Sequence, residues 1–267
     1  TDFRRQIWYV PFGESLIELA LDRGKIQSRG KSTPICEIEL ELISGHVADI
    51  FALTRQLQEK LDLHPAIASK AERGYNLFLG TPLASFRSKP SPLTAELSPV
   101  EAFRSIALSC LEHFQRNEHG LRDSEDPEYV HQARVALRRL RSAIKLFTPV
   151  LPNDFVAAYG ETWKTLASAL GDARNWDVFL DETLPPIRNA FPKEPDVSRL
   201  KQEGLRRARR ARKAVTTLMA LAEYPKLITE FTAAVFALND MVPISLADLA
   251  SSQLTRHAHK AHKLASR

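Results

Sequence analysis

The chain has 267 residues, of which 44% are hydrophobic and 26% are charged, the composition of an ordinary soluble globular protein with one or two domains. Its net charge of +5 and pI of about 9.2 favour an anionic partner without identifying it. No window approaches the roughly 18 apolar residues of a membrane span, and the first residues lack the apolar core of a secretory signal, so we expect neither. Cys36 and Cys110 lie far apart without metal-ligand spacing, which predicts free thiols in a reducing cytoplasm.

The first part of the chain reads as strands followed by helices. The strand-like segments are 4–10, 14–22 and 35–42, with a turn predicted at 22–25 between the last two. Apolar residues then recur at helical spacing over 47–62, and a short helix is predicted at 69–78.

A change in composition separates this part from the next. Residues 81–99 are rich in Pro and Ser, so we predict a linker over 81–97 between a domain at 1–80 and a domain at 98–267. Residues 1–97 hold 12 basic and 12 acidic side chains, whereas residues 98–267 hold 25 and 20. The excess positive charge therefore belongs to the second domain.

The second domain is predicted to be helical throughout, because none of its segments alternates with a period of two. The expected helices are 99–116, 127–147, 153–170, 175–190, 197–222, 225–239 and 245 to the end. The predicted fold class is therefore α+β, with a sheet and its helices followed by an all-α bundle.

A row of carboxylates marks one face of the strand at 35–42. Glu37, Glu39 and Glu41 alternate with apolar residues, and Glu18 and Asp22 share a face in the preceding strand. Such a row is compatible with a strand face in water. Like charges about 7 Å apart repel, however, so a cation above them explains the row better. Oxygen ligands without His or Cys suit Mg²⁺ or Mn²⁺.

The segments CEIELELISG and ASKAERGY, preceded by FRRQIW and IELALDRG, resemble the C-terminal half of the CYTH family, the triphosphate tunnel metalloenzymes. The resemblance implies part of an antiparallel β tunnel that binds triphosphate and an activating Mg²⁺ or Mn²⁺. It implies metal ligands and triphosphate contacts on this chain. The implied metal ligands are Glu37, Glu39 and Glu41, and the implied triphosphate contacts are Arg5, Lys70 and Arg73. The first half of the tunnel would lie outside this chain, and the full-length parent would be an inorganic triphosphatase.

The segment at 127–147 predicts a helix with a purely cationic polar face. Its cations fall within an arc of roughly 80° on a helical wheel, opposite an apolar stripe. We call this set the cationic face: His131, Arg134, Arg138, Arg141 and Lys145. Charge runs are often solvated surface, but exposed helices commonly intersperse Glu among their cations, and this face contains none.

Two further helical segments, 205–214 and 255–267, also gather cations. The first contributes Arg206, Arg209, Arg210 and Lys213, and the second contributes Arg256, His259, Lys260, Lys263 and Arg267. Because the arginine fork matches phosphate oxygens, three such helices in one domain favour a shared groove for a long polyanion.

The segments DPEYVHQARVALRRLRSAIKLF and LGDARNWDVF resemble the CHAD family, the conserved-histidine α-helical domains. The resemblance implies that the cationic face binds inorganic polyphosphate, that Arg174 lies near it, and that Asp177 orients this arginine. It also implies association with polyphosphate granules and a second helical repeat that is incomplete here. The sequence assigns no catalytic residue.

A nucleic acid is the alternative ligand for the same basic helices. The basic arcs contain no aromatic side chain for base stacking and no recognition-helix motif, which favours polyphosphate over nucleic acid.

Overall fold

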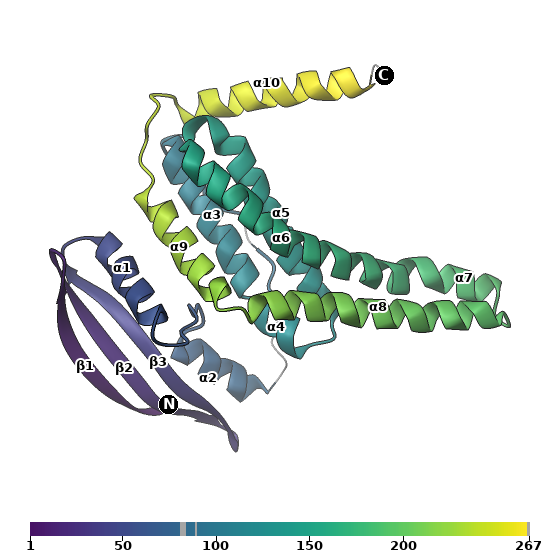
Figure 1. Ribbon diagram of the computed structural model, residues 1–267, viewed down its shortest axis with the longest axis horizontal. Helices are drawn as coiled ribbons and strands as arrows, with labels where there is room; N and C mark the ends of the chain where they lie inside the picture. The colour runs from purple at the N-terminus through teal and green to yellow at the C-terminus, as the bar shows by residue number, and fades with distance from the viewer. Residues whose placement is uncertain (81–83, 89, 266–267) are drawn as a thin grey trace. The chain divides into compact units, whose positions relative to one another are not determined.

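The computed structural model of the protein describes residues 1–80, 84–88 and 90–265. It confirms the α+β fold class, with three strands followed by helices (Figure 1). The chain forms two compact units, Thr1–Ala84 with Ala220–Ala237, and Ser85–Met219 with Leu238–Arg267. Within the described residues, no helix has the length and apolar character needed to cross a membrane.

The first unit contains an open antiparallel sheet in the order β1-β2-β3. Its strands are β1 (Asp2–Phe12), β2 (Ser15–Ser28) and β3 (Lys31–Ser44). The predicted turn at 22–25 is wrong, because β2 continues through these residues and the chain turns at Arg29 and Gly30, which have φ of 48° and 76°. The glycine in the expected turn, Gly24, instead allows close pairing with β1, since a Cβ there would lie within 2.5 Å of Phe3.

The register of the strands confirms that the carboxylates share one face. Asp22 pairs with Arg5 on one side and Glu37 on the other, and Glu18 pairs with Glu41. Alternation along each strand then places Glu39 on this same face, which we call the acidic face.

Three helices complete the first unit. Helix α1 (Val47–Gln58) contacts β3 and α9 (Glu223–Ala237), with the rings of Phe51 and Phe236 5.7 Å apart. Helix α2 (Lys70–Leu79) contacts β2 from the acidic face, through side chains described below. Because Lys70 and Arg73 neutralise the carboxylates, α2 can lie over this face.

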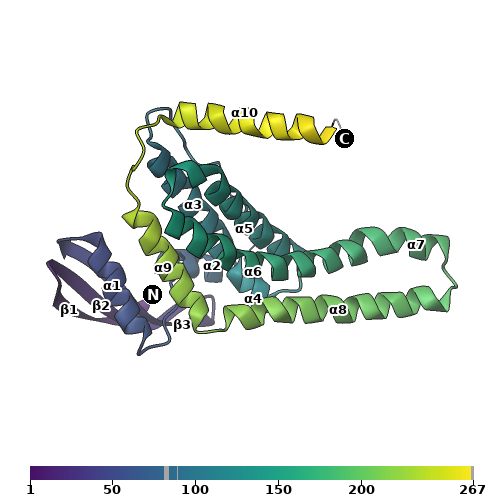
Figure 2. The ribbon, with the colours of Figure 1, turned by 45° about the horizontal axis from the view of Figure 1, so that its top comes forward.

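The second unit is a stack of helices in which α3 contacts α5, α5 contacts α6, and α6 contacts α8 (Figure 2). Its helices are α3 (Pro99–Gln115), α4 (Glu118–Asp123), α5 (Pro127–Phe147), α6 (Asn153–Val178), α7 (Leu184–Ala190), α8 (Pro195–Met219) and α10 (Leu246–Ala265). A 3₁₀ turn (Thr148–Val150) follows α5, and a π-helical turn (Phe179–Thr183) joins α6 to α7. Fully buried Phe103, Leu137 and Trp163 mark the core of this unit.

Two differences from the predicted helices have local causes. The helices expected at 153–170 and 175–190 are joined, since α6 runs through 178 and the single Gly171 between them does not break it. Helix α4 was missed because six residues are too few to show a period. Both cysteines are free thiols, as predicted.

Part of the segment predicted as a linker is attached to the helices of the second unit. The backbone N–H of Phe86 donates to Asn117 Oδ1, and Asn117 Nδ2 donates to the Phe86 carbonyl, both at 3.0 Å. Asn117 is completely buried, and the Arg116 guanidinium lies 5.0 Å from the centre of the Phe86 ring. These bonds hold the chain ahead of α3 against the C-terminal end of that helix.

Candidate functional site

Helix α5 has the two opposite faces that its sequence predicts. Its apolar face is buried: Ala136, Leu137, Leu140, Ala143, Ile144 and Phe147. The helix begins at Pro127, where the Asp126 carboxylate accepts a hydrogen bond from the backbone N–H of Glu128 at 2.9 Å. Because the apolar face packs against α3 and α6, the rotation of α5 is fixed and its polar face is turned outwards.

The cationic face lies on this outward side. Arg138, Arg141 and Lys145 are exposed, while His131 and Arg134 are half-buried. In the part of the chain that the structure describes, neither the three exposed cations nor Arg134 forms an ion pair. The face therefore carries positive charge that no described carboxylate neutralises.

Helix α6 passes directly beside this face. A Cβ on Gly171 would lie 3.8 Å from the Nε of Arg134, so the glycine leaves room for the arginine at the contact of the two helices. Arg174 follows Gly171 by one turn and so lies on the same side of α6. Its guanidinium contacts Glu182 at 3.5 Å, a long and partly exposed pair.

The expected role of Asp177 is corrected by the structure. Its Oδ1 accepts a hydrogen bond from Arg212 at 3.0 Å, so its partner is Arg212 on α8 rather than Arg174. Arg212 also donates to the carbonyl of Glu125 at 2.9 Å, just ahead of α5. Burial raises the pKa of Asp177, and the hydrogen bond from Arg212 opposes that rise. This pair joins α6, α8 and the start of α5.

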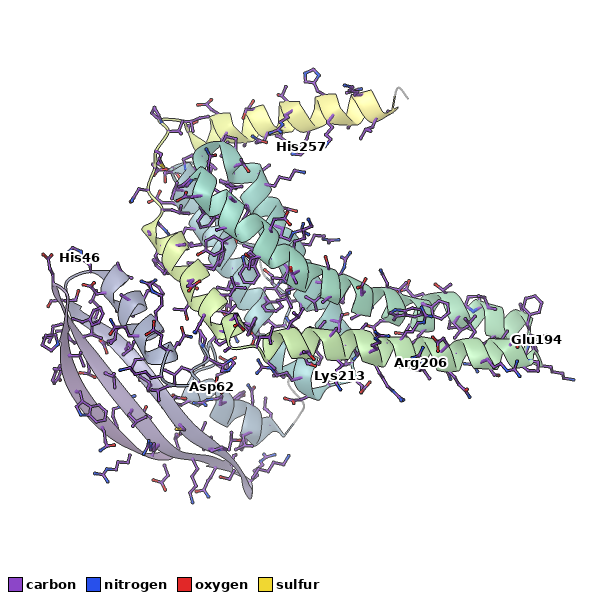
Figure 3. All side chains as sticks on the ribbon, in the orientation of Figure 1. His46, Asp62, Glu194, Arg206, Lys213 and His257 are labelled. Carbon is purple, nitrogen blue, oxygen red and sulfur yellow. The ribbon has the colours of Figure 1, made fainter. Side chains whose placement is uncertain are left out.

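The predicted cations of α8 are all exposed: Arg206, Arg209, Arg210 and Lys213. Figure 3 labels Arg206 and Lys213 along this helix. The segment 205–214 contains no acidic residue, but Glu203 just ahead of it accepts two hydrogen bonds from Arg206, at 2.7 and 2.8 Å. These bonds, with one from Arg207, lower the pKa of Glu203 to about 2. The spacing of three and four residues would have revealed these pairs in the sequence.

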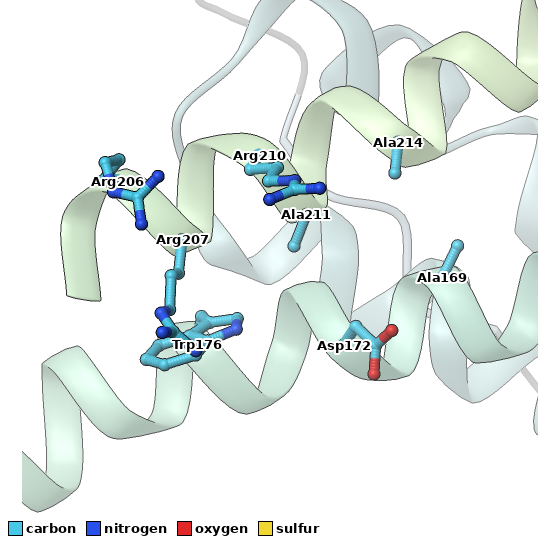
Figure 4. A pocket seen from close by; sticks show the side chains of 8 residues that line it. All are labelled: Ala169, Asp172, Trp176, Arg206, Arg207, Arg210, Ala211 and Ala214. Atoms are coloured by element: carbon cyan, nitrogen blue, oxygen red, sulfur yellow. The ribbon is translucent and has the colours of Figure 1, made fainter. Parts of the chain in front are cut away.

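A groove of about 430 Å³ lies between α6 and α8 (Figure 4). It is lined by Ala169, Asp172 and Trp176 from α6, and by Arg206, Arg207, Arg210, Ala211 and Ala214 from α8. The Arg207 guanidinium lies 5.4 Å from the centre of the Trp176 ring. Trp176 was not predicted from the sequence. Only aromatic residues within the basic segments themselves were considered, and this ring belongs to α6 rather than α8.

Only some of the predicted basic residues meet in this groove. Arg206 and Arg210 belong to its lining, whereas Arg209 and Lys213 lie elsewhere on α8. On α10 the predicted cations are exposed: Arg256, His259, Lys260 and Lys263. Arg267 lies outside the described residues.

A second cleft, of about 540 Å³, adjoins the opposite edge of the cationic face. Its lining includes His131, Arg139 and Arg87. Polar contacts connect several of its lining residues. His113 Nε2 lies 3.0 Å from Gln132 Oε1. Glu128 Oε1 accepts hydrogen bonds from Gln132 Nε2 at 2.8 Å and from Arg87 at 3.1 Å. Burial lowers the pKa of His113, so this histidine is held neutral as a hydrogen-bonding group of the core.

The acidic face of the sheet carries a compact cluster of carboxylates. Single oxygens of Asp22, Glu37 and Glu39 lie within 4.8 Å of one another, close enough for one cation to contact all three. The structure thus groups two of the predicted metal ligands with Asp22. Glu41 lies further along the same face, opposite Glu18 and near Tyr9, whose pKa is raised mainly by its hydrogen bond with Glu18.

The three predicted triphosphate contacts all bind this cluster. Arg5 donates to Asp22 at 2.8 and 2.7 Å and to Glu39 at 2.5 Å. Lys70 contacts Asp22 at 2.7 Å and Glu39 at 2.5 Å, and it also pairs with Glu37. Arg73 pairs with Glu37. Three carboxylates and three cations thus form one neutral network.

This network shifts the pKa values of its members in the expected directions. Its hydrogen bond with Arg5 lowers the pKa of Asp22 to about 2, although the side chain is buried. Lys70 lowers the pKa of Glu39, with a smaller effect from Arg5. Burial opposes the charge of Lys70, but its three carboxylate partners raise its pKa overall. Asp22, Glu39 and Lys70 are therefore charged at neutral pH.

Comparisons with known proteins found a matching domain family and similar relatives. The family model of the CHAD domain matches residues 105–267, which include all the predicted basic helices. A crystal structure of the CHAD domain from the plant Ricinus communis is 33% identical, with a TM-score of 0.52, and covers 66% of this chain and 58% of that chain. The inorganic triphosphatase of Haemophilus influenzae is 48% identical over 77 residues, 29% of this chain and 22% of the relative. This chain thus spans about a fifth of that curated relative.

Proposed function

We propose, from the premise that this chain belongs to the CHAD domain family, that its helical unit binds inorganic polyphosphate along the cationic face of α5. The observation that carries this proposal is the run of Arg134, Arg138, Arg141 and Lys145 without an ion-pair partner among the described residues. A polyphosphate supplies negative oxygens at regular short intervals, so it can contact several cations spaced along one helix.

Cations on neighbouring helices extend this surface in the proposal. Arg174 stands beside the face on α6, and α8 offers Arg206, Arg209, Arg210 and Lys213. The pair between Arg206 and Glu203 would weaken its contact with phosphate, so Arg209, Arg210 and Lys213 are the stronger candidates on α8. Association with polyphosphate granules and a cytoplasmic location remain predictions.

Competition between anions tests the choice of ligand. Because binding releases counterions, we expect polyphosphate affinity to fall at least about tenfold between 50 and 200 mM salt. DNA or RNA at the same phosphate concentration should displace little labelled polyphosphate, which fluorescence polarisation would show. Equal displacement by nucleic acid would instead favour the alternative, a nucleic-acid-binding protein using the same face.

We further propose that the first unit is the C-terminal half of a triphosphate tunnel whose full-length parent hydrolyses inorganic triphosphate. Two observations support this proposal: the cluster of Asp22, Glu37 and Glu39, and the 48% identity to a protein described as an inorganic triphosphatase. The carboxylate oxygens fit Mg²⁺ or Mn²⁺, which prefer oxygen ligands, better than they fit zinc.

The residues of the cluster have distinct tasks in this proposal. Glu37, Glu39 and Asp22 would hold the cation, with Glu41 as a further predicted ligand on the same face. When bound, a divalent cation would supply polarisation of the phosphoryl oxygens. Arg5, Lys70 and Arg73 would turn from the carboxylates to the phosphate oxygens, since all three side chains are partly accessible to solvent.

In the full-length parent, the double change Glu37→Gln/Glu39→Gln should lower the turnover of triphosphate by at least about 100-fold in Mg²⁺ or Mn²⁺, because it removes two charged ligands. Phosphate release, measured colorimetrically, reports the loss. The matched control is Glu14→Gln/Glu59→Gln, which neutralises two exposed glutamates away from the cluster and should leave turnover unchanged. Full activity in the first variant would contradict the metal assignment.

A further inference from the structure

The groove between α6 and α8 contains a feature that a bare polyphosphate does not need. Trp176 lines the groove with its ring half-exposed, and Arg207 lies over that ring at 5.4 Å. A polyphosphate chain consists only of phosphorus and oxygen and has no planar group that could stack on an indole, so Trp176 would contribute little to its binding. Aromatic rings beside arginine are instead a common platform for planar, heterocyclic groups.

The residues along the groove form an ordered series. In Figure 4, Trp176, Arg206 and Arg207 lie at one end, Arg210, Ala211 and Asp172 in the middle, and Ala169 and Ala214 toward the other end. From Trp176 to Ala169, α6 spans seven residues, or about 10 Å of helix. The volume of about 430 Å³ is within the usual range for small-molecule sites, and the alanines leave its floor free of bulky side chains.

The groove contains both cations and a carboxylate, which favours a ligand that carries hydrogen-bond donors as well as phosphates. Arg210 has no ion-pair partner among the described residues, so its guanidinium is available to an anion. Asp172 likewise has no hydrogen-bond partner among them. A carboxylate repels a bare polyanion, whereas it accepts hydrogen bonds from sugar hydroxyls or from the amino group of a base.

We propose that this groove binds nucleoside polyphosphates, with the base stacked on Trp176, hydroxyl or amino groups donating to Asp172, and the phosphates bound by Arg210. The inference goes beyond the proposed binding of inorganic polyphosphate by the cationic face of α5. It concerns a different ligand and depends on a ring that lies outside that face.

The test compares two probes that share a triphosphate and differ in the nucleoside: ATP and inorganic tripolyphosphate, both titrated calorimetrically in EDTA. We expect Trp176→Ala to weaken ATP binding about fivefold or more, since base stacking on an aromatic side chain is worth about that factor or more. Binding of tripolyphosphate should stay within about twofold. Arg210→Ala should weaken both probes by a similar factor, because it removes a phosphate contact.

Two further variants protect the test against misfolding. Trp176→Phe keeps an aromatic ring at this position and should retain part of the preference for ATP over tripolyphosphate. Trp8→Ala removes a tryptophan that is 46% exposed in the other unit, and it should change the affinity for neither probe. If the wild-type chain binds long-chain polyphosphate but not ATP, or if Trp176→Ala weakens both probes equally, the inference is overturned while the proposed function stands. Trp176-dependent binding of ATP without any binding of long-chain polyphosphate would overturn the proposed function and leave this inference intact.

Discussion

Replacing Arg138 and Arg141 together by glutamate is expected to abolish polyphosphate binding, with a loss of at least about 100-fold. Both side chains are exposed at the centre of the cationic face, where no described carboxylate pairs with them. The double reversal makes the local charge more negative by four. The new carboxylates then repel the polyphosphate, and such contacts between like charges reduce the binding free energy by several kcal/mol. Fluorescence polarisation with labelled polyphosphate would measure the change.

The matched control for this variant reverses two cations elsewhere on the same unit. Arg199 and Lys201 near the start of α8 are exposed and lie outside every candidate site, so Arg199→Glu/Lys201→Glu makes the same change in net charge. If binding depends on total charge alone, the two double variants will bind equally weakly. A loss confined to Arg138→Glu/Arg141→Glu supports the cationic face, and an unchanged affinity would rule it out.

Removing Arg212 is expected to lower the free energy of unfolding by about 3 kcal/mol, the usual result when one partner of a buried ion pair is lost. Asp177 is 5% exposed and Arg212 is 17% exposed, so Arg212→Met leaves a carboxylate buried without its partner. The variant also loses the hydrogen bond to the Glu125 carbonyl ahead of α5. Urea unfolding followed by circular dichroism would measure the change.

Two companion variants separate the ion pair from the arginine itself. Arg210→Met, two residues away and exposed, should change the stability by less than about 0.5 kcal/mol. Arg212→Met/Asp177→Leu should recover part of the loss, because no buried charge then remains without a partner. A loss of stability in Arg210→Met as large as in Arg212→Met would show that the pair has no special role.

The sequence was informative where a repeating pattern within one element decides the structure. The period of α5 separates a buried apolar face from an exposed cationic one, and the alternation in β3 places Glu37 and Glu39 on one side. In α5 the burial of the apolar side chains sets the rotation of the helix, so the position of its charges follows, whereas in β3 the period of two alone places the glutamates together. The strand ends were less certain, since a glycine such as Gly24 serves a turn or a close contact between strands equally well.

The sequence by itself therefore determined the α+β class, the cationic face and the row of carboxylates. Only the tertiary structure decided the partners of these groups. Asp177 pairs with Arg212, 35 residues away, Asp22 joins Glu37 and Glu39, and Trp176 meets arginines from another helix. Periodicity places a side chain on a face of its own element, but which charges meet depends on the packing of elements far apart in the chain, where burial makes pairing obligatory.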